Sequence, residues 1–341
     1  MDTFIRVDAS IEIGTGHVMR CLTFAHQLKK EGMLVAFICR GTEGDCIELI
    51  EKQGFHVYKL TNYKGSLWTY VADHWEKDVK ETIDVLRQHN VKKLIIDHYS
   101  IDIKWEQAAR AFTKEIIIID DLANRQHDCD ILLDQNFYLN METRYKGLVP
   151  YATKMLLGPA HVLLREEFME ARGRIKPFNG KVERLFIFFG GSDPTNETEK
   201  VLLAIKPIID QSEILVDVVV GNSNPNRVKI KQLCNKIENA HYHCQIDNIA
   251  ELMAQADLAI GAGGATILER IFLQLPSIII VVADNQLQTT LDVCSTGSAK
   301  YIGKSKEYTK WNLVSTLNTL MLNSFEVQRM IFECNKIINK R

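Results

Sequence analysis

Long hydrophobic runs, basic tracts and paired cysteines are all missing from this chain of 341 residues. The longest apolar run, from Ser277 to Ala283, is far too short to cross a bilayer, which takes about 20 apolar residues. The 41 basic and 43 acidic residues nearly balance, and without a basic tract there is no electrostatic footprint for nucleic acid. The eight cysteines form no CxxC pair, which indicates reduced thiols. We therefore expect a small-molecule partner, no nucleic acid and no membrane insertion.

The chain runs directly into an apolar strand without a charged and then an apolar stretch, so we expect no leader segment. We expect a cytoplasmic protein. The sequence leaves the oligomeric state open and favours a monomer.

Short apolar runs alternate with helical patterns along the chain, which is typical of an α/β protein with parallel sheets. In the first half we expect strands at 4–7, 34–39, 57–60, 93–97, 115–120 and 131–134, with helices at 17–31, 45–53, 66–89 and 102–113. In the second half we expect strands at 184–189, 214–220, 241–244, 257–260, 277–282 and 299–302, with helices at 194–209, 225–237, 247–255, 264–274 and 285–295.

The alternation breaks between Leu157 and Glu183, where Gly158-Pro159 and Pro177 indicate a connection between domains. We predict a Rossmann-like domain over 1–157, a connecting segment over 158–183 and a second Rossmann-like domain over 184–323. The last helix, 324–341, is expected to pack back on the first domain.

A glycine loop, Gly14-Thr15-Gly16-His17, joins the first strand to the first helix and puts a histidine at the helix start. Unpaired N–H groups and the helix dipole disfavour an imidazolium there, so His17 should stay neutral and serve as a base. A dinucleotide fingerprint would need a small residue where Met19 stands, although Arg40 would suit the 2′-phosphate of NADP. A reductase and a plain tight turn therefore remain open alternatives.

Polar residues follow several strands of the first half, and ligands bind at the carboxyl ends of such strands. We expect Asp97, Tyr99 and Asp121 to lie near His17, and Asp8 to orient its ring. Two aspartates, Asp120 and Asp121, are followed closely by Asn124-Arg125. We interpret them as residues that anchor a loop rather than as a catalytic pair, since turns after strands also select aspartate.

The second half carries a better phosphate turn, Gly261 to Thr266, between a strand and a helix. Bare N–H groups there suit a diphosphate, and Glu269 could accept from two ribose hydroxyls. An ordinary helix with an exposed glutamate is the alternative. Gly190 and Gly191 follow the first strand of this half, where Asp193 should cap a helix that begins at Pro194.

Two further groups in this half carry weaker signals. Asn285 and Gln286 stand at a strand end and could bind a sugar, whereas His241 and His243 lack a third ligand for zinc.

Taken together, these motifs resemble a known family, the UDP-2,4-diacetamido-2,4,6-trideoxy-β-L-altropyranose hydrolases of pseudaminic acid biosynthesis. The resemblance covers nearly the whole chain. The matching runs are Arg6-Val7-Asp8, Gly14 to Leu22, Ile96 to Tyr99, Asp120 to Ala123, Asp128 to Asn136, Leu163 to Phe168 and Gly190 to Pro194.

The resemblance implies a GT-B fold, two Rossmann-like domains with parallel sheets facing a central cleft, similar to the glycosyltransferase that builds lipid II. It implies removal of UDP by inverting water attack at the anomeric carbon, with His17 as the general base and neither metal nor cofactor. A GT-B glycosyltransferase with a separate acceptor and a nucleotide-sugar binding protein remain alternatives. The substrate contacts expected are Arg6, Asp8, Gly14, Gly16, Tyr99, Arg165, Gly190, Gly191, Gly263, Gly264, Ala265, Thr266, Glu269, Asn285 and Gln286.

Overall fold

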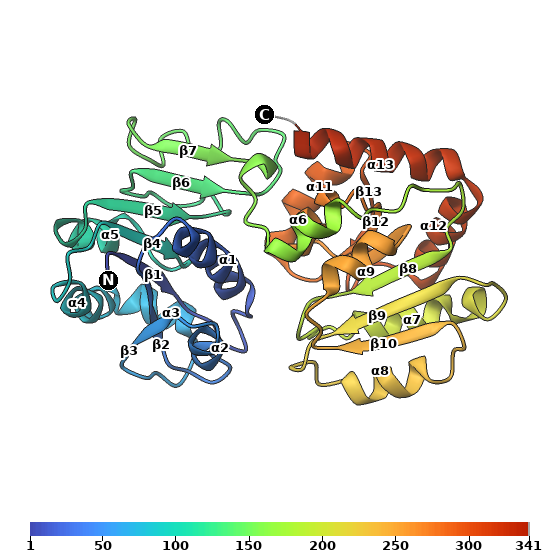
Figure 1. Cartoon of the computed structure of the whole chain (residues 1–341), viewed down its shortest axis with the longest axis horizontal. Coiled ribbons are helices and arrows are strands. Elements are labelled where there is room, and N and C mark those ends of the chain that lie inside the picture. The colour runs from blue at the N-terminus through green and yellow to red at the C-terminus, as the bar shows by residue number, and fades with distance from the viewer. Residues whose placement is uncertain (340–341) are drawn as a thin grey trace. The chain divides into compact units, whose positions relative to one another are not determined.

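The computed structural model describes residues 1–339, which form two compact units (Figure 1). Unit 1 comprises residues 1–136 and 140–163, and unit 2 comprises residues 137–139 and the chain from 164 onward. The segment 158–183, which we expected to be a connection, is thus divided between the units at 163/164. No helix within residues 1–339 is long and apolar enough to span a membrane.

Unit 1 contains a parallel sheet of seven strands in the order β3-β2-β1-β4-β5-β6-β7. The strand order reverses between β1 and β4, and ligands of open parallel sheets bind at the carboxyl ends beside such a reversal. The strands are β1 Thr3–Val7, β2 Val35–Arg40, β3 His56–Leu60, β4 Lys93–Asp97, β5 Glu115–Ile119, β6 Ile131–Asp134 and β7 Lys154–Leu157. The helices are α1 Gly16–Lys30, α2 Ile47–Lys52, α3 Leu67–Asp73, α4 Trp75–Leu86 and α5 Ile103–Ala109, with 3₁₀ turns at Arg110–Phe112 and Pro159–His161.

Unit 2 repeats this design with six parallel strands in the order β10-β9-β8-β11-β12-β13, so its reversal lies between β8 and β11. The strands are β8 Arg184–Phe188, β9 Leu215–Val220, β10 Ala240–Cys244, β11 Leu258–Ala262, β12 Ser277–Val281 and β13 Ala299–Lys304. The helices are α6 Glu166–Arg172, α7 Glu197–Ile209, α8 Arg227–Cys234, α9 Ile249–Gln255, α10 Thr266–Phe272, α11 Leu287–Ser295, α12 Lys310–Leu322 and α13 Ser324–Asn339, with a 3₁₀ turn at Asp284–Gln286.

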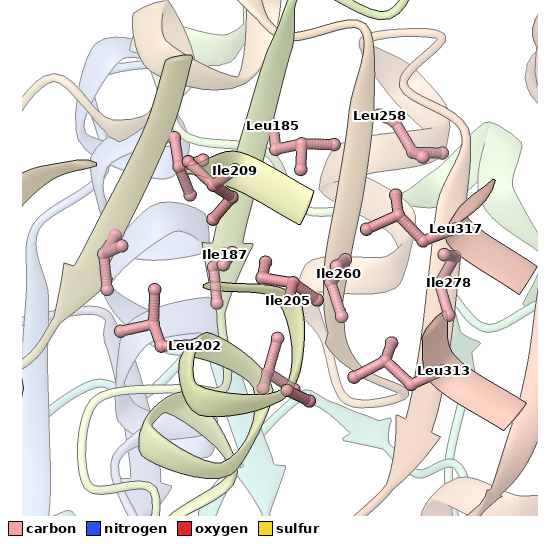
Figure 2. Close-up of a cluster of buried hydrophobic side chains, with 14 of the residues drawn as sticks. Leu185, Ile187, Leu202, Ile205, Ile209, Leu258, Ile260, Ile278, Leu313 and Leu317 are labelled. Atoms are coloured by element: carbon pink, nitrogen blue, oxygen red, sulfur yellow. The ribbon is translucent and has the colours of Figure 1, made fainter. Parts of the chain in front are cut away.

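Both sheets are buried on their two faces, which explains why their central strands are runs of β-branched residues rather than alternating patterns. Strand β5 reads Glu-Ile-Ile-Ile-Ile, and β12 reads Ser-Ile-Ile-Ile-Val. On one face of the sheet of unit 2, side chains of three strands pack against helices α7 and α12 (Figure 2). The packed residues include Leu185, Ile187, Ile260, Ile278, Leu202, Ile205, Leu313 and Leu317.

The sequence predicts the central strands within one or two residues, and it differs from the structure at the following places. Strand β7 was not expected, and the long helix predicted over 66–89 is two helices, α3 and α4, that break at His74. The last helix was expected to pack on the first domain. Its described part, α13, instead packs on α10 and α12 within unit 2, because Val327 and Met330 enter the core of that unit. Residues 340–341 of the predicted helix lie outside the described residues.

Candidate functional site

His17 lies at the start of α1, as the sequence predicts, where it is the second residue of the helix, and it is largely buried. Its Nδ1 lies 2.5 Å from Oδ1 of Asp97, the last residue of β4. A carboxylate only accepts hydrogen bonds, so Nδ1 carries a proton in this pair, and a neutral ring in this tautomer has its lone pair on Nε2. Among residues 1–339, Nε2 has no hydrogen-bond partner. The histidine therefore has one nitrogen held and one basic nitrogen available.

Asp97 contacts three side chains of α1. Its carboxylate accepts two hydrogen bonds from Arg20, at 2.6 and 2.7 Å, and one from the thiol of Cys21 at 3.4 Å, in addition to that of His17. Residues 17, 20 and 21 share one face of the helix, which is why a single carboxylate reaches all of them. Burial alone would raise the pKa of Asp97, but the charge of Arg20 and the hydrogen bonds from Arg20 and His17 outweigh burial and hold the pKa well below the usual value.

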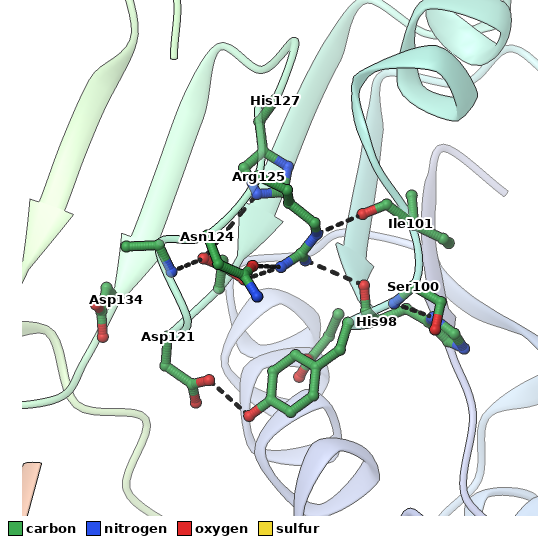
Figure 3. Close-up of polar contacts among 12 residues, drawn as sticks. His98, Ser100, Ile101, Asp121, Asn124, Arg125, His127 and Asp134 are labelled. Carbon is green, nitrogen blue, oxygen red and sulfur yellow. Dashed lines mark hydrogen bonds and ion pairs between the residues drawn. The ribbon is translucent and has the colours of Figure 1, made fainter. Parts of the chain in front are cut away.

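Tyr99 and Asp121 complete the polar surroundings of His17. The Tyr99 hydroxyl donates to Asp121 Oδ1 at 2.6 Å, the bond drawn beside Asp121 in Figure 3, and Arg20 reaches Asp121 Oδ2 at 2.8 Å. The Tyr99 ring stands edge-on to His17, with ring centroids 4.5 Å apart. Burial and the Asp121 carboxylate raise the pKa of Tyr99, so the phenol keeps its proton. The expectation that Asp97, Tyr99 and Asp121 lie near His17 is confirmed.

Trp68, from the start of α3, is a neighbour of His17 that sequence reasoning missed. Its ring stacks on Tyr99 with centroids 5.3 Å apart and an interplanar angle of 12°, and stands edge-on to His17 at 6.1 Å. Trp68 and Tyr99 form what we call the aromatic wall. The available signal was an isolated tryptophan at a helix start, just after the carboxyl end of a strand, in a segment without clear periodicity.

Asp8 does not orient His17, so that expectation is wrong. Its carboxylate is completely buried and binds Arg6 at 2.6 Å and the backbone N–H of Arg40 at 2.7 Å, while His98 Nε2 lies 3.4 Å away. Arg6 in turn binds Asp78 at 2.8 Å. Arg6 and Asp8 were both expected to contact substrate, yet their contacts hold the end of β1 from inside the unit.

The alternative of an NADP-dependent reductase depends on Arg40, and the contacts of Arg40 exclude a role at the 2′-phosphate. The side chain is fully buried and donates to Asp78 Oδ2 at 2.8 Å and to the carbonyl of Thr61 at 2.5 Å. A guanidinium held in this way is not presented to a 2′-phosphate.

The loop after β5 behaves as an anchor, as the sequence suggests (Figure 3). Arg125 donates to Asp120 Oδ1 and to the carbonyl of Ile101, both at 2.7 Å, and to the carbonyl of His98 at 3.2 Å. Asp120 also accepts from the backbone of Ala123. Arg125 therefore ties together the loops that follow β4 and β5.

Asp134 ends β6 beside this anchor and is almost completely buried. The Tyr145 hydroxyl lies 3.0 Å from its Oδ2, and the N–H of Asn136 donates to its Oδ1 at 3.0 Å. Burial, together with the charge of Asp121, raises the pKa of Asp134 to about 7. Asp134 is thus a carboxyl group that holds a proton close to neutral pH.

Gly14 and Gly16 line the loop before His17. Gly14 has a φ of +76°, which favours glycine, and a Cβ at either position would meet no atom within 4 Å. Open space therefore adjoins the helix start that carries the histidine.

The turn between β11 and α10 in unit 2 leaves backbone donors uncommitted. The N–H groups of Gly263, Gly264, Ala265 and Thr266 make no hydrogen bond within residues 1–339. A Cβ at Gly263 would collide with Oγ1 of Thr290, so the chain passes here only because the residue is glycine. The turn thus offers the row of bare N–H groups that the sequence predicts for a diphosphate.

Glu269 lies in the first turn of α10 and is half-buried rather than fully exposed. Its Oε1 is 3.5 Å from Nη2 of Arg165, the residue before α6, and Arg165 also pairs with Glu167 at 2.5 Å. Burial raises the pKa of Glu269, and the Arg165 charge opposes that shift. The structure thus brings together two residues, Arg165 and Glu269, that the sequence named separately.

Gln286 and Asn285 lie in the 3₁₀ turn beside the Gly263 turn. Gln286 Oε1 accepts from the N–H of Val282 at 3.2 Å, and its Nε2 would lie 3.3 Å from a Cβ at Gly264. Asn285 is exposed. The side-chain oxygen of Gln286 is therefore already hydrogen-bonded, while Asn285 is exposed to solvent.

The loop after β8 differs from the expectation at the helix start. Gly190 has a φ of +90°, and Gly191 accepts a hydrogen bond from Ser223. Asp193 caps α7 through the N–H groups of Glu197 and Thr198, both at 2.9 Å. The helix begins at Glu197 and not at Pro194, because a separate turn from Asp193 to Asn196 precedes it and Asn196, at φ +57°, is left-handed.

Metal-ligand clusters of three or more His, Cys, Asp or Glu side chains do not occur within residues 1–339. His243, one of the two histidines weighed as zinc ligands, binds Asp217 through Nε2 at 2.8 Å.

The two parallel-sheet units, each with its own strand-order reversal, define the GT-B fold. Residues 185–336 match the model of the glycosyltransferase family 28 C-terminal domain. A crystal structure of MurG from Acinetobacter baumannii superposes with a TM-score of 0.67 at 17% identity, over 98% of this chain and 94% of that one.

Sequence relatives point to a particular group within this fold. The chain is 29% identical, over 85% of its length and 94% of the relative, to UDP-2,4-diacetamido-2,4,6-trideoxy-beta-L-altropyranose hydrolase of Campylobacter jejuni. It is 22% identical, over 94% of its length and 89% of the relative, to the spore coat polysaccharide biosynthesis protein SpsG of Bacillus subtilis. The resemblance that the motifs indicate is thereby confirmed.

Proposed function

We propose that this chain is an enzyme that hydrolyses UDP-2,4-diacetamido-2,4,6-trideoxy-β-L-altropyranose to UDP and the free sugar. The observation that carries the proposal is the His17–Asp97 pair, with Nδ1 held at 2.5 Å and Nε2 without a partner in the described chain. The similarity to the Campylobacter jejuni hydrolase supports the substrate. The proposal assigns the base to residues 1–157 and UDP binding to residues 184–323.

The proposed reaction breaks the bond between the anomeric carbon and the diphosphate oxygen. A water molecule attacks that carbon and gives its proton to Nε2 of His17, a role that suits a neutral imidazole. The electron pair of the broken bond leaves on the UDP oxygen, and attack opposite the leaving group inverts the configuration. His17 returns its proton to solvent between turnovers.

UDP has to leave as an anion, and the residues proposed to hold it lie in unit 2. The bare N–H groups of Gly263 to Thr266 suit the diphosphate, since oriented backbone donors stabilise charge without reorganising. Glu269 suits the ribose hydroxyls, and Asn285 suits the sugar. Gly190 and Gly191 complete the proposed contacts.

The test is to incubate the protein with the UDP-sugar alone and follow UDP release. Steady turnover without an acceptor is the expected result, and turnover should persist in a chelator because no metal takes part in the proposal. In ¹⁸O-labelled water the label should enter the free sugar. Label in UDP would contradict attack at carbon.

A GT-B glycosyltransferase is the second candidate, because the match at residues 185–336 is to a glycosyltransferase domain model. It would use the same donor turn but pass the sugar to an acceptor hydroxyl in place of water. The same incubation separates the two candidates. UDP release that depends on an added acceptor would support the transferase, and tight UDP binding without any turnover would support a binding protein.

A further inference from the structure

Arg270 is a buried cation that the proposed reaction does not yet use. It lies on α10, four residues after Thr266, and its side chain is 1% exposed. Its Nη2 donates to the carbonyl of Ala262, the last residue of β11, at 2.6 Å. A Cβ at Gly261 would collide with Arg270 Nη1, so the glycine at that position makes room for the guanidinium.

The charge of Arg270 has no counter-ion within hydrogen-bond reach. Nε and Nη1 are buried without a hydrogen-bond partner within residues 1–339, and no carboxylate in that part of the chain lies within 4.0 Å of the guanidinium. Burial lowers the pKa of Arg270 to about 10, while its ionisable neighbours, the Glu269 carboxyl and the Cys294 and Cys334 thiols, oppose that shift, so Arg270 remains a cation at neutral pH. A buried unpaired charge costs stability, and any anion bound nearby would reduce that cost.

The position of this cation relates it to the phosphate turn. Ala262, whose carbonyl Arg270 holds, directly precedes Gly263, the first residue with an uncommitted N–H group. Because consecutive Cα atoms are ~3.8 Å apart, an anion bound by these N–H groups would lie within about 10 Å of the guanidinium. At such a separation, through protein rather than water, a unit charge changes anion affinity by about tenfold or more.

We propose that Arg270 is a positioning residue for a nucleoside diphosphate, which fixes the Gly263 turn through Ala262 and supplies buried positive charge beneath it. This inference rests on the proposed function, because it takes the diphosphate to bind at that turn. A neutral side chain could satisfy the Ala262 carbonyl equally well. The charge is therefore the property that distinguishes this role from a structural one.

The test compares uridine, UMP and UDP binding to the full chain by calorimetry, in the wild type and in two variants. Arg270→Gln keeps a donor for Ala262 and removes the charge, so UDP affinity should fall about tenfold or more while uridine affinity changes less than about twofold. Arg270→Lys keeps the charge and should retain UDP affinity within about threefold at pH 7. Arg329→Gln, an exposed arginine of α13, is the control for net charge.

Equal loss of uridine and UDP affinity in Arg270→Gln, or no loss of UDP affinity, would overturn the inference. If Arg270→Gln does not fold, the Arg270→Lys variant decides by its pH profile. A buried lysine loses its proton more readily than arginine, so UDP affinity should fall between pH 7 and 9 in that variant and not in the wild type. Parallel profiles would overturn the inference. A wild type that binds no UDP would overturn the proposed function and this inference with it.

Discussion

His17 Nδ1 and Asp97 Oδ1 lie 2.5 Å apart, so the histidine at the start of α1 is oriented by the last residue of β4. Asp97 itself is fixed by two hydrogen bonds from Arg20. The pair has the geometry of a general base and its orienting carboxylate, in which the carboxylate selects the tautomer and stabilises the imidazolium that forms.

Replacing His17 by alanine tests the base directly. We expect turnover of the UDP-sugar to fall by about 10²–10⁴-fold, the usual contribution of a general base, while the dissociation constant of UDP stays close to that of the wild type. Initial rates and calorimetric titration measure the two quantities. Unchanged turnover would remove His17 from the mechanism.

Replacing Asp97 by asparagine removes the charge and the tautomer selection together. We expect turnover to fall by about 10²-fold or more, and the free energy of unfolding to fall as well, because the buried Arg20 loses one of its two carboxylate partners and keeps Asp121. The kinetic effect should nearly vanish in a His17→Ala background, since the two residues act as a unit. Additive losses of turnover in the double variant would show that Asp97 acts independently of His17.

Replacing Trp68 by alanine tests the aromatic wall. Stacking of this kind contributes about 0.5–1.5 kcal/mol, so kcat/KM should fall by roughly 3–10-fold with UDP affinity unchanged. Trp68→Phe should recover part of the loss, and Trp311→Ala, an exposed tryptophan of α12, is the control. A loss of UDP affinity of the same size would contradict a role confined to the surroundings of His17.

Replacing Glu269 by alanine tests ribose recognition. A hydrogen bond to a charged group contributes about 1.5–3 kcal/mol, so UDP should bind about tenfold or more weakly, and preference for UDP over 2′-deoxy-UDP should shrink. Glu167→Ala is the matched control, because Glu167 also pairs with Arg165 but has no assigned contact to UDP. Retained discrimination in Glu269→Ala would refute the assignment.

Asp134 predicts a pH dependence of stability. Its folded pKa of about 7 lies above the value of about 4 expected in the unfolded chain, so between these values the folded state holds a proton that the unfolded state has lost. Stability from this group therefore falls as pH rises from about 4 to about 7. Relative to Asp134→Asn, the wild type should lose on the order of 3 kcal/mol between pH 5 and pH 8 in urea unfolding. A constant difference would exclude the raised pKa.

Local patterns predicted most of the fold because the buried strands are strongly apolar. Strands β4 and β6 were predicted at the bounds that the structure has, as the runs Lys93–Asp97 and Ile131–Asp134 end in clear polar residues. Strand β7 was not predicted because it is a four-residue edge strand, exposed at Lys154 and Met155, that pairs with β6 alone. The break between α3 and α4 at His74 was not predicted because no glycine or proline marks it.

The sequence predicted which strand ends carry the residues of the candidate site, but it did not predict which side chains bind one another there. Asp8 and Asp97 lie at the carboxyl ends of β1 and β4, which are neighbours in the sheet, so the sequence alone could not decide which carboxylate meets His17. In the structure Arg6 binds Asp8 at 2.6 Å, and the buried Asp78 of α4 binds Arg6 in turn. Asp8 is thereby engaged inside the unit, and Asp97 is left for His17. These contacts of Asp8 are visible only in the folded structure and could not be read from the sequence.

Three side chains of helix α1, at positions 17, 20 and 21, converge on one acceptor of the sheet, Asp97. The rotation of the helix about its axis therefore also sets the direction in which the His17 side chain points. A one-residue shift in the loop before Gly16 would turn the helix by about 100° and carry His17 away from its carboxylate. Engineering of that loop can thus change residues other than Gly14 but not the length of the loop.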